Sequence, residues 1–201
     1  ALVMGLASCS AVEPKKEVTF PALLKGYNAL EFGVNDKQEA ENRLFTNVGV
    51  DFGPVNLQYH GLNSINDVDE KTYFGRHAFG VGNTGLGLEA IALLKTNSEG
   101  FLDKRGGIRD KNLMKALQGS YGWVDVTAND QNLTLESFYG KDIGRGFTVE
   151  AFQSLKLPFD DRHLSHYFEV QGFYRLAPHI SLFLREEVNT PDVTRYNFKD
   201  A

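Results

Sequence analysis

The sequence predicts an all-β protein, an antiparallel, mainly up-and-down β-barrel of about ten strands within a range of eight to twelve. Three observations lead to this prediction. Apolar and polar residues alternate through most of the chain from Tyr27 to Val188, residues that form tight turns separate many of the alternating stretches, and the 201-residue length fits one domain. Strands of about 9 to 11 residues with their turns would use nearly all of that length.

The alternation at period two is clear near the start of this region. Leu30, Phe32 and Val34 alternate with Glu31 and Gly33. Because successive side chains of a strand point to opposite faces, each such stretch has one apolar and one polar face. The same pattern recurs in residues 43–52, 147–157, 165–176 and 180–187. The residues of the polar faces are more highly charged than the core of a soluble protein, which favours a barrel with a polar interior.

The links between these stretches differ in length. Gly, Asn, Asp and Pro supply the backbone angles of tight turns. Short links are expected at Phe52–Pro54, Gly82–Gly85, Ala128–Asp130 and Pro158–His163, and longer polar links at Asn35–Asn42, Asn63–Lys71, Asn97–Asn112 and Gly140–Gly146. Short and long links therefore alternate along most of the chain, which predicts a barrel with short turns at one rim and longer loops at the other.

Composition excludes several classes of protein. A net charge of −5 from 21 basic and 26 acidic residues leaves no basic stripe, so a nucleic-acid partner is not expected. The single cysteine cannot form an intramolecular disulfide. Mean hydropathy is −0.30, and the chain lacks the run of about 18 apolar residues that a membrane-spanning helix needs. Strands hide their hydrophobicity at alternate positions, so this value is compatible with a membrane barrel.

The amino-terminal residues suggest export. Residues 1–11 are expected to be the remnant of a signal peptide, because Leu2–Ser8 is short, apolar and rich in small residues. The run that ends in Cys9 resembles the lipobox of bacterial lipoproteins, which makes Cys9 a lipidation candidate; cleavage of a plain signal peptide after Ala11 is the alternative. Residues 12–26 are expected to be a polar lead-in, and residues 27–201 a single barrel domain.

Over residues 27–188 the chain resembles the bacterial outer-membrane β-barrel proteins, in a porin-like class defined by strand pattern and export signal. The resemblance implies an outer-membrane location, an apolar face in contact with outer-membrane lipid, and passage of small solutes or ions as the porin-like activity. One feature departs from the class, whose last strand usually ends in an aromatic residue. Here Phe198 lies three residues before the final Ala201, which leaves open a truncated chain, an unusual assembly signal or a different family.

The polar face supplies the candidate functional residues. Lumen-facing positions are predicted at Glu31, Arg43, Glu150, Lys156, Glu169, Arg175 and Arg185, within a wider inward set that also contains Asp51, Gln58, Glu89, Lys95, Glu136 and Glu187. This set carries both signs of charge, whereas an ion filter would carry one. A barrel of about ten strands has a narrow lumen. We therefore expect a narrow channel or a structural barrel with a paired interior, without catalytic residues, a bound metal or a cofactor.

Other interpretations remain open at this stage. A soluble periplasmic or surface-anchored β-barrel lipoprotein would turn the apolar face inward around a small apolar ligand. His163 and Ser165 resemble the H-x-S pair of outer-membrane lipid A deacylases, a weak enzyme alternative because the next acid on that face, Glu169, lies about 20 Å along the strand. Gly80, Gly82 and Gly85 fit a dinucleotide-binding spacing but equally a hairpin turn. Trp123 and the tyrosines are candidates for an interfacial aromatic girdle.

Overall fold

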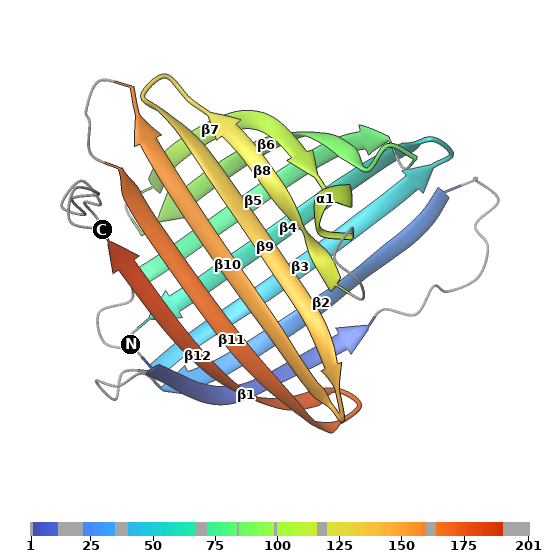
Figure 1. The fold of residues 1–201 in the computed structure, drawn as a ribbon, viewed down its shortest axis with the longest axis vertical. Coiled ribbons are helices and arrows are strands. Elements are labelled where there is room, and N and C mark those ends of the chain that lie inside the picture. The colour runs from blue at the N-terminus through green and yellow to red at the C-terminus, as the bar shows by residue number, and fades with distance from the viewer. Residues whose placement is uncertain are drawn as a thin grey trace, which may run out of the picture.

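The computed structural model describes residues 2–11, 22–34, 40–66, 72–83, 85–98, 100–115, 120–159 and 164–190, and these form one closed antiparallel barrel (Figure 1). The predicted all-β, up-and-down fold is therefore confirmed. The twelve strands of the described residues are β1 (Leu2–Ala11), β2 (Ala22–Val34), β3 (Ala40–Phe52), β4 (Val55–Asn66), β5 (Thr72–Asn83), β6 (Leu88–Asn97), β7 (Gly100–Asp110), β8 (Ser120–Ala128), β9 (Asn132–Gly144), β10 (Phe147–Pro158), β11 (Ser165–Ala177) and β12 (Ile180–Thr190). One short helix, α1 (Asn112–Lys115), follows β7.

Each strand pairs with its neighbours in sequence, and β1 closes the barrel by pairing with both β2 and β12. Leu6, for example, lies opposite Leu182 on one side and Phe32 on the other. When the strand register is followed once around the barrel, it returns to β1 with an offset of about 16 residues. In a barrel of twelve strands, this offset gives a strand tilt of about 40 to 45° relative to the barrel axis. β1 begins and β12 ends at the same rim, named here the β1 rim; the opposite rim carries α1 and is named the α1 rim (Figure 1).

The two strands beyond the expected ten are β1 and β7. Residues 2–11, expected to be a leader remnant, instead form β1. All of the paired residues that join β1 to β12 lie in the segment 2–8, so a chain cleaved and lipidated at Cys9 would lose the pairing that closes the barrel. The expected polar lead-in is also partly strand, because residues 22–26 belong to β2, while residues 12–21 lie outside the described residues.

β7 occupies a segment that the sequence analysis assigned to one long link, residues 97–112. Its outward positions include Lys104 and Gly106, and a second glycine, Gly107, follows at once, so the outer face lacks a continuous apolar row. Although its alternation of apolar and polar residues is weak, β7 pairs with β6 from Gly100 to Asp110 and with β8 over the shorter stretch 106–110. Backbone hydrogen bonds to the two neighbouring strands therefore stabilise β7 as a strand, although its residues have weak intrinsic strand propensity.

The extra strand also changes which links share a rim. The turns near Gly82–Gly85 and Ala128–Asp130, expected at the same rim, lie at opposite rims because β7 intervenes. The α1 rim has tight turns such as Gly53–Pro54 and Pro178–His179 but also the link that contains α1. The expected division into a short-turn rim and a long-loop rim is therefore wrong.

The glycine motif at the end of β5 forms a hairpin turn. Gly80 and Gly82 lie in β5, which pairs antiparallel with β6, and the Asn83 side-chain oxygen accepts hydrogen bonds from the backbone N–H groups of Gly85 (2.9 Å) and Leu86 (3.1 Å). A dinucleotide-binding unit would place a helix after this loop. The segment continues as a strand, so the turn interpretation holds. No helix among the described residues is long and apolar enough to cross a membrane.

Two adjacent glycines in β7 test this strand assignment. A Cβ at Gly107 would lie 2.0 Å from the Val126 carbonyl oxygen of β8, whereas a Cβ at Gly106 meets nothing within 4 Å. We expect Gly107→Ala to lower the free energy of unfolding by about 1 to 3 kcal/mol, because the clash is with backbone that cannot yield, and Gly106→Ala to leave it nearly unchanged. Urea unfolding followed by the fluorescence of the single Trp123 measures both; equal effects would contradict the β7–β8 pairing.

Candidate functional site

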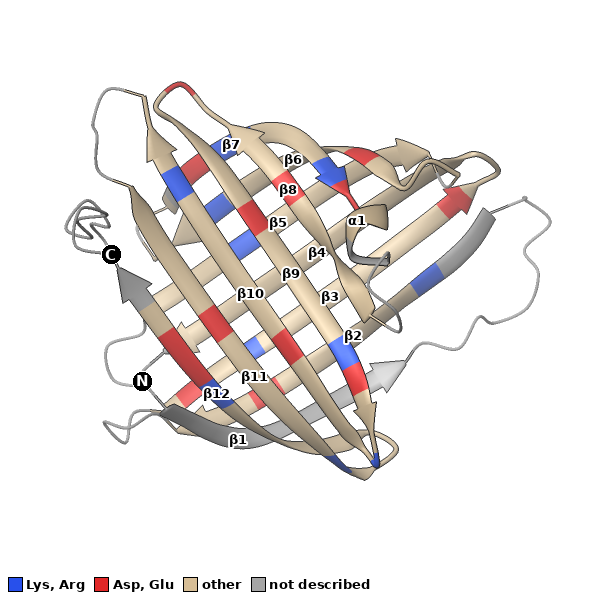
Figure 2. Ribbon diagram, viewed as in Figure 1, with Lys and Arg blue, Asp and Glu red and all other residues tan. Residues whose placement is uncertain are grey.

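The inner and outer faces of the barrel have opposite polarity. On β12, Arg185 points inward and is 1% exposed, while the next residue outward, Leu184, is 47% exposed. The strand alternation repeats this contrast around the barrel. Large apolar side chains exposed on the outer face include Phe32, Leu44, Val48, Leu57, Phe79, Val81, Ile108, Val126, Leu133, Leu182 and Val188. Figure 2 shows acidic and basic residues along the strands themselves as well as near their ends. The buried charges make the lumen the candidate site.

One group of charges joins β2 and β3 to β11 and β12. Arg43 is its centre, with ion-pair distances of 2.6 Å from Nε to Glu41, 2.9 Å from Nη1 to Glu169 and 2.6 Å from Nη2 to Glu187. β3 and β11 are separated in the sheet by β2, β1 and β12. Arg43 therefore reaches across the inside of the barrel wall and bridges carboxylates that the backbone holds apart.

Arg185 lies in the same group and shares its carboxylates. Its Nε is 2.9 Å from Glu187, its Nη1 is 3.6 Å from Glu31, and its Nη2 contacts Glu41. Removal of either arginine would leave the buried carboxylates with only one arginine to balance their charge. Unbalanced charge in a medium of low dielectric constant lowers the stability of the folded protein. The residues of this Arg43–Arg185 cluster are Glu31, Glu41, Arg43, Glu169, Arg185 and Glu187.

A second group of charges lies on the other side of the lumen. Arg109 of β7 forms two parallel bonds to Asp125 of β8, each 2.7 Å long, and both side chains are fully buried. Arg76 of β5 reaches Glu136 of β9 at 2.5 Å and Asp125 at 3.5 Å, and Lys95 of β6 lies 3.2 Å from the other oxygen of Glu136. These five residues are the Arg76–Arg109 cluster, and they link strands β5 to β9 across the interior.

Aromatic and apolar side chains fill space beside the charges. The guanidinium groups of Arg109 and Arg76 lie 4.3 and 5.2 Å from the ring centroid of Trp123, close enough for cation–π attraction. Phe138 and Phe152 pack against the same indole at 6.2 and 6.1 Å. Four further apolar side chains are buried among the described residues, namely Ala78, Ile91, Leu93 and Phe183. The interior is therefore a packed mixture of charges and rings, more apolar than the sequence analysis expected.

The structure brings four of the seven predicted lumen residues together: Glu31, Arg43, Glu169 and Arg185 all belong to one cluster. The other three lie elsewhere on the inner face. Glu150 accepts a hydrogen bond from the Tyr121 hydroxyl. Arg175 is exposed near the α1 rim, and its side chain has no ion-pair partner among the described residues. Lys156 lies near the β1 rim, where it lines a cavity.

Several residues of the network were absent from the sequence-based set: Glu41, Arg76, Asp103, Arg105, Arg109 and Asp125. Asp103, Arg105 and Arg109 lie on β7, which was taken for a link. Asp125 could have been found, since Val124 and Val126 alternate with Trp123, Asp125 and Thr127 along β8. The same alternation places Trp123 on the inner face of β8. The expectation that Trp123 belongs to an aromatic girdle on the outer face is therefore wrong.

The tyrosines divide between the two faces. Tyr121 and Tyr167 point inward and donate hydrogen bonds to Glu150 and Glu169. Tyr59 shares the outer face with Phe79, and its hydroxyl lies 2.9 Å from the ring nitrogen Nδ1 of His77. A girdle made of all the tyrosines is therefore excluded, although outward members remain.

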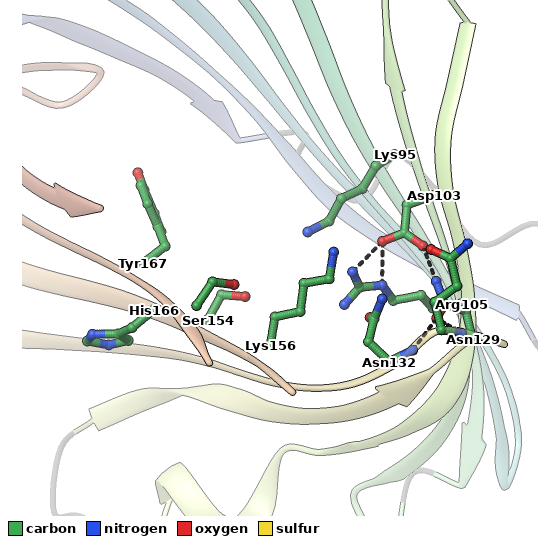
Figure 3. Close-up of a pocket in the computed structure, with 11 residues that line it drawn as sticks. Lys95, Asp103, Arg105, Asn129, Asn132, Ser154, Lys156, His166 and Tyr167 are labelled. Atoms are coloured by element: carbon green, nitrogen blue, oxygen red, sulfur yellow. Dashed lines mark hydrogen bonds and ion pairs between the residues drawn. The ribbon is translucent and has the colours of Figure 1, made fainter. Parts of the chain in front are cut away.

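The H-x-S pair is only partly contained in the described residues. His163 lies outside them, and Ser165 lines the cavity near the β1 rim. His166, the next residue, lies on the opposite side of β11 from Tyr167 (Figure 3). No group of three or more His, Cys, Asp or Glu side chains in the described segments could hold a metal ion.

The cavity near the β1 rim has a volume of about 330 Å³ and a polar lining from strands β6, β7, β9, β10 and β11 and the turn before β9. Lys156 extends toward the pair formed by Asp103 and Arg105, whereas the ammonium group of Lys95 points away from that pair (Figure 3). The Asn129 amide donates to the second oxygen of Asp103 at 2.8 Å. The lining is thus hydrophilic and carries more positive than negative side chains.

Comparison with protein-family models, with curated proteins and with solved structures found no match to this chain. The functional argument therefore depends on the geometry of the barrel.

The Arg43–Arg185 cluster makes a quantitative prediction. Arg185→Met should lower the free energy of unfolding by about 3 to 5 kcal/mol, because it leaves Glu31, Glu41 and Glu187 with one fewer cation in a buried site. Arg175→Met is the matched control on the neighbouring strand; its side chain is exposed, so a change within about 0.5 kcal/mol is expected. Denaturant titration of the refolded variants measures both, and a neutral Arg185→Met would refute a stabilising role for the cluster.

Proposed function

We propose that this chain is a bacterial outer-membrane β-barrel with a narrow lumen plugged by its own side chains, acting as a structural membrane protein or a weakly conducting, porin-like channel for small solutes or ions. One observation carries the proposal: charged side chains are buried inside the barrel, and large apolar side chains are exposed around its outside. Such an outer surface is what a hydrocarbon environment requires.

The same observation counts against a soluble barrel. A soluble barrel that holds an apolar ligand has its apolar face inward and its charged face in water. Here Arg109, Asp125 and Glu136 are fully buried in the interior, and the cavity near the β1 rim is lined by polar side chains. Exposure of so many apolar residues to water would also produce a patch far larger than soluble monomers tolerate. The soluble lipoprotein alternative is therefore not favoured.

The plugged lumen follows from barrel size and charge pairing. Eight strands leave room only for side chains, whereas 16 to 18 strands enclose an open channel. With twelve strands, long side chains from separated walls can still meet, as Arg76 meets Glu136. Both charge clusters contain acids and bases, so neither resembles the single-sign ring of an ion filter. The expected behaviour is weak and poorly selective conduction, or none.

Substitution on the two faces of β10 tests the membrane orientation. Val149 belongs to the outward set and Thr148 to the inward set of this strand. Arginine on the lipid face costs about 2 to 4 kcal/mol near the bilayer centre and less toward the interfaces. We expect Val149→Arg to lose up to that amount in lipid vesicles and Thr148→Arg to lose less.

The measurement is a urea titration of protein refolded into vesicles, repeated for each variant. Equal losses for the adjacent pair would reject the assignment of the apolar face to lipid. Wild-type protein that stays folded and monodisperse without detergent or lipid would reject the membrane proposal itself.

Conductance tests the plugged lumen. Planar-bilayer recordings of purified protein should show small, poorly selective currents or none, because ion pairs and aromatic rings occupy the interior. Arg43→Ala should increase conductance if the Arg43–Arg185 cluster blocks the path, while the exposed Arg175→Ala should not. Large, stable currents from the wild type would overturn the plugged-lumen proposal and favour a wider pore.

A further inference from the structure

We propose that the cavity near the β1 rim is a binding site for a small, multiply charged oxyanion of the phosphate or carboxylate type. The proposal adds a ligand class to the lumen described above. It rests on the barrel geometry and the charges of the lining, and it does not require that the lumen conduct.

Charged side chains of both signs line the cavity. Lys95, Arg105 and Lys156 contribute three cations, and Asp103 is the only carboxylate among the described lining residues. Glu136, the acid nearest to Lys95, is shared with Arg76 at 2.5 Å, so it is already paired without Lys95. The lining therefore has an excess of positive charge in a partly enclosed space, where electrostatic attraction is stronger than in bulk water.

The two lysines of the lining have hydrogen-bond donors that a bound anion can use. The side chain of Lys156 has no ion-pair or hydrogen-bond partner among the described residues, and Lys95 makes one contact, with Glu136. An ammonium group has three N–H donors, so both lysines can donate to a bound anion. Arg105 differs, because each of its three guanidinium nitrogens already contacts Asp103 or Thr134, and these contacts hold it in place. It contributes positive charge and shape to the site, and the lysines contribute the contacts.

The cavity is small and is reached from the lumen. Lys95, Arg105 and Lys156 lie on the inner faces of β6, β7 and β10, so a ligand reaches them from the opening of the lumen and not from surrounding lipid. A volume of about 330 Å³ lies at the lower end of the range for small-molecule sites. These features favour a small soluble anion over a lipid headgroup with attached acyl chains.

Calorimetric titration of the full chain in uncharged detergent with pyrophosphate, at low and constant ionic strength, tests the site. Wild type should bind, and Lys156→Gln should weaken the affinity about tenfold or more, since it removes a charge-assisted contact. Asp103→Asn should strengthen binding by removing the opposing charge. Lys104→Gln is the matched control: Lys104 lies between Asp103 and Arg105 in sequence but is exposed on the outer face, so the same loss of charge there should leave the affinity unchanged.

The outcomes separate a specific site from general charge attraction. Absence of binding by the wild type, equal weakening by Lys156→Gln and Lys104→Gln, or weaker binding by Asp103→Asn would each overturn the proposal. Circular dichroism and heat-dependent gel mobility, recorded for every sample, show whether the barrel is folded. Binding in detergent is independent of the bilayer measurements above, so this inference can fail while the membrane proposal stands, and the reverse.

Discussion

The burial of charge inside a closed sheet is the constraint on which the rest of this barrel depends. Because strand side chains alternate between faces, a sheet with an apolar exterior must place its remaining residues inside. Those residues include arginines and carboxylates with almost no access to solvent, such as Arg109 and Asp125. Each must find an opposite charge within the lumen or pay a large desolvation cost. The register of the strands therefore has to be compatible with the pairing of the charges.

The two charge clusters show how the register meets this requirement. Arg43 and Glu169 are far apart in sequence but are brought together because β1 closes the sheet between β2 and β12. Arg109 and Asp125 face each other directly across the β7–β8 pair, where Arg109 is the residue opposite Asp125. Both strands that the sequence pattern did not predict therefore matter to the interior: β1 closes the sheet beside the first cluster, and β7 contributes Arg109 to the second.

Alternation alone allowed ten of the twelve described strands, the antiparallel order and the division of each strand into an apolar and a polar face to be predicted, but not which face lies inside. It failed where local composition and tertiary pairing disagree. β7 contains Gly106 and Gly107 beside a charged run, and only its hydrogen bonds to β6 and β8 make it a strand. The apolar β1 resembles an export signal, since a short hydrophobic stretch has the same composition in both roles. Partners across the lumen, such as Arg76 and Glu136, could not be predicted, because their contact depends on strand number and tilt.

The distribution of charge within the lumen is uneven, and this unevenness gives the interior its functional character. In the Arg43–Arg185 cluster four carboxylates surround two arginines, whereas the Arg76–Arg109 cluster has three cations to two carboxylates. The cavity near the β1 rim adjoins the second cluster through Lys95 and adds Lys156 to the same side. One wall of the lumen is therefore acidic and the other basic. An anion entering at that rim would be attracted to the basic wall and repelled by the acidic one, and this difference is the physical basis of the anion site proposed at the β1 rim.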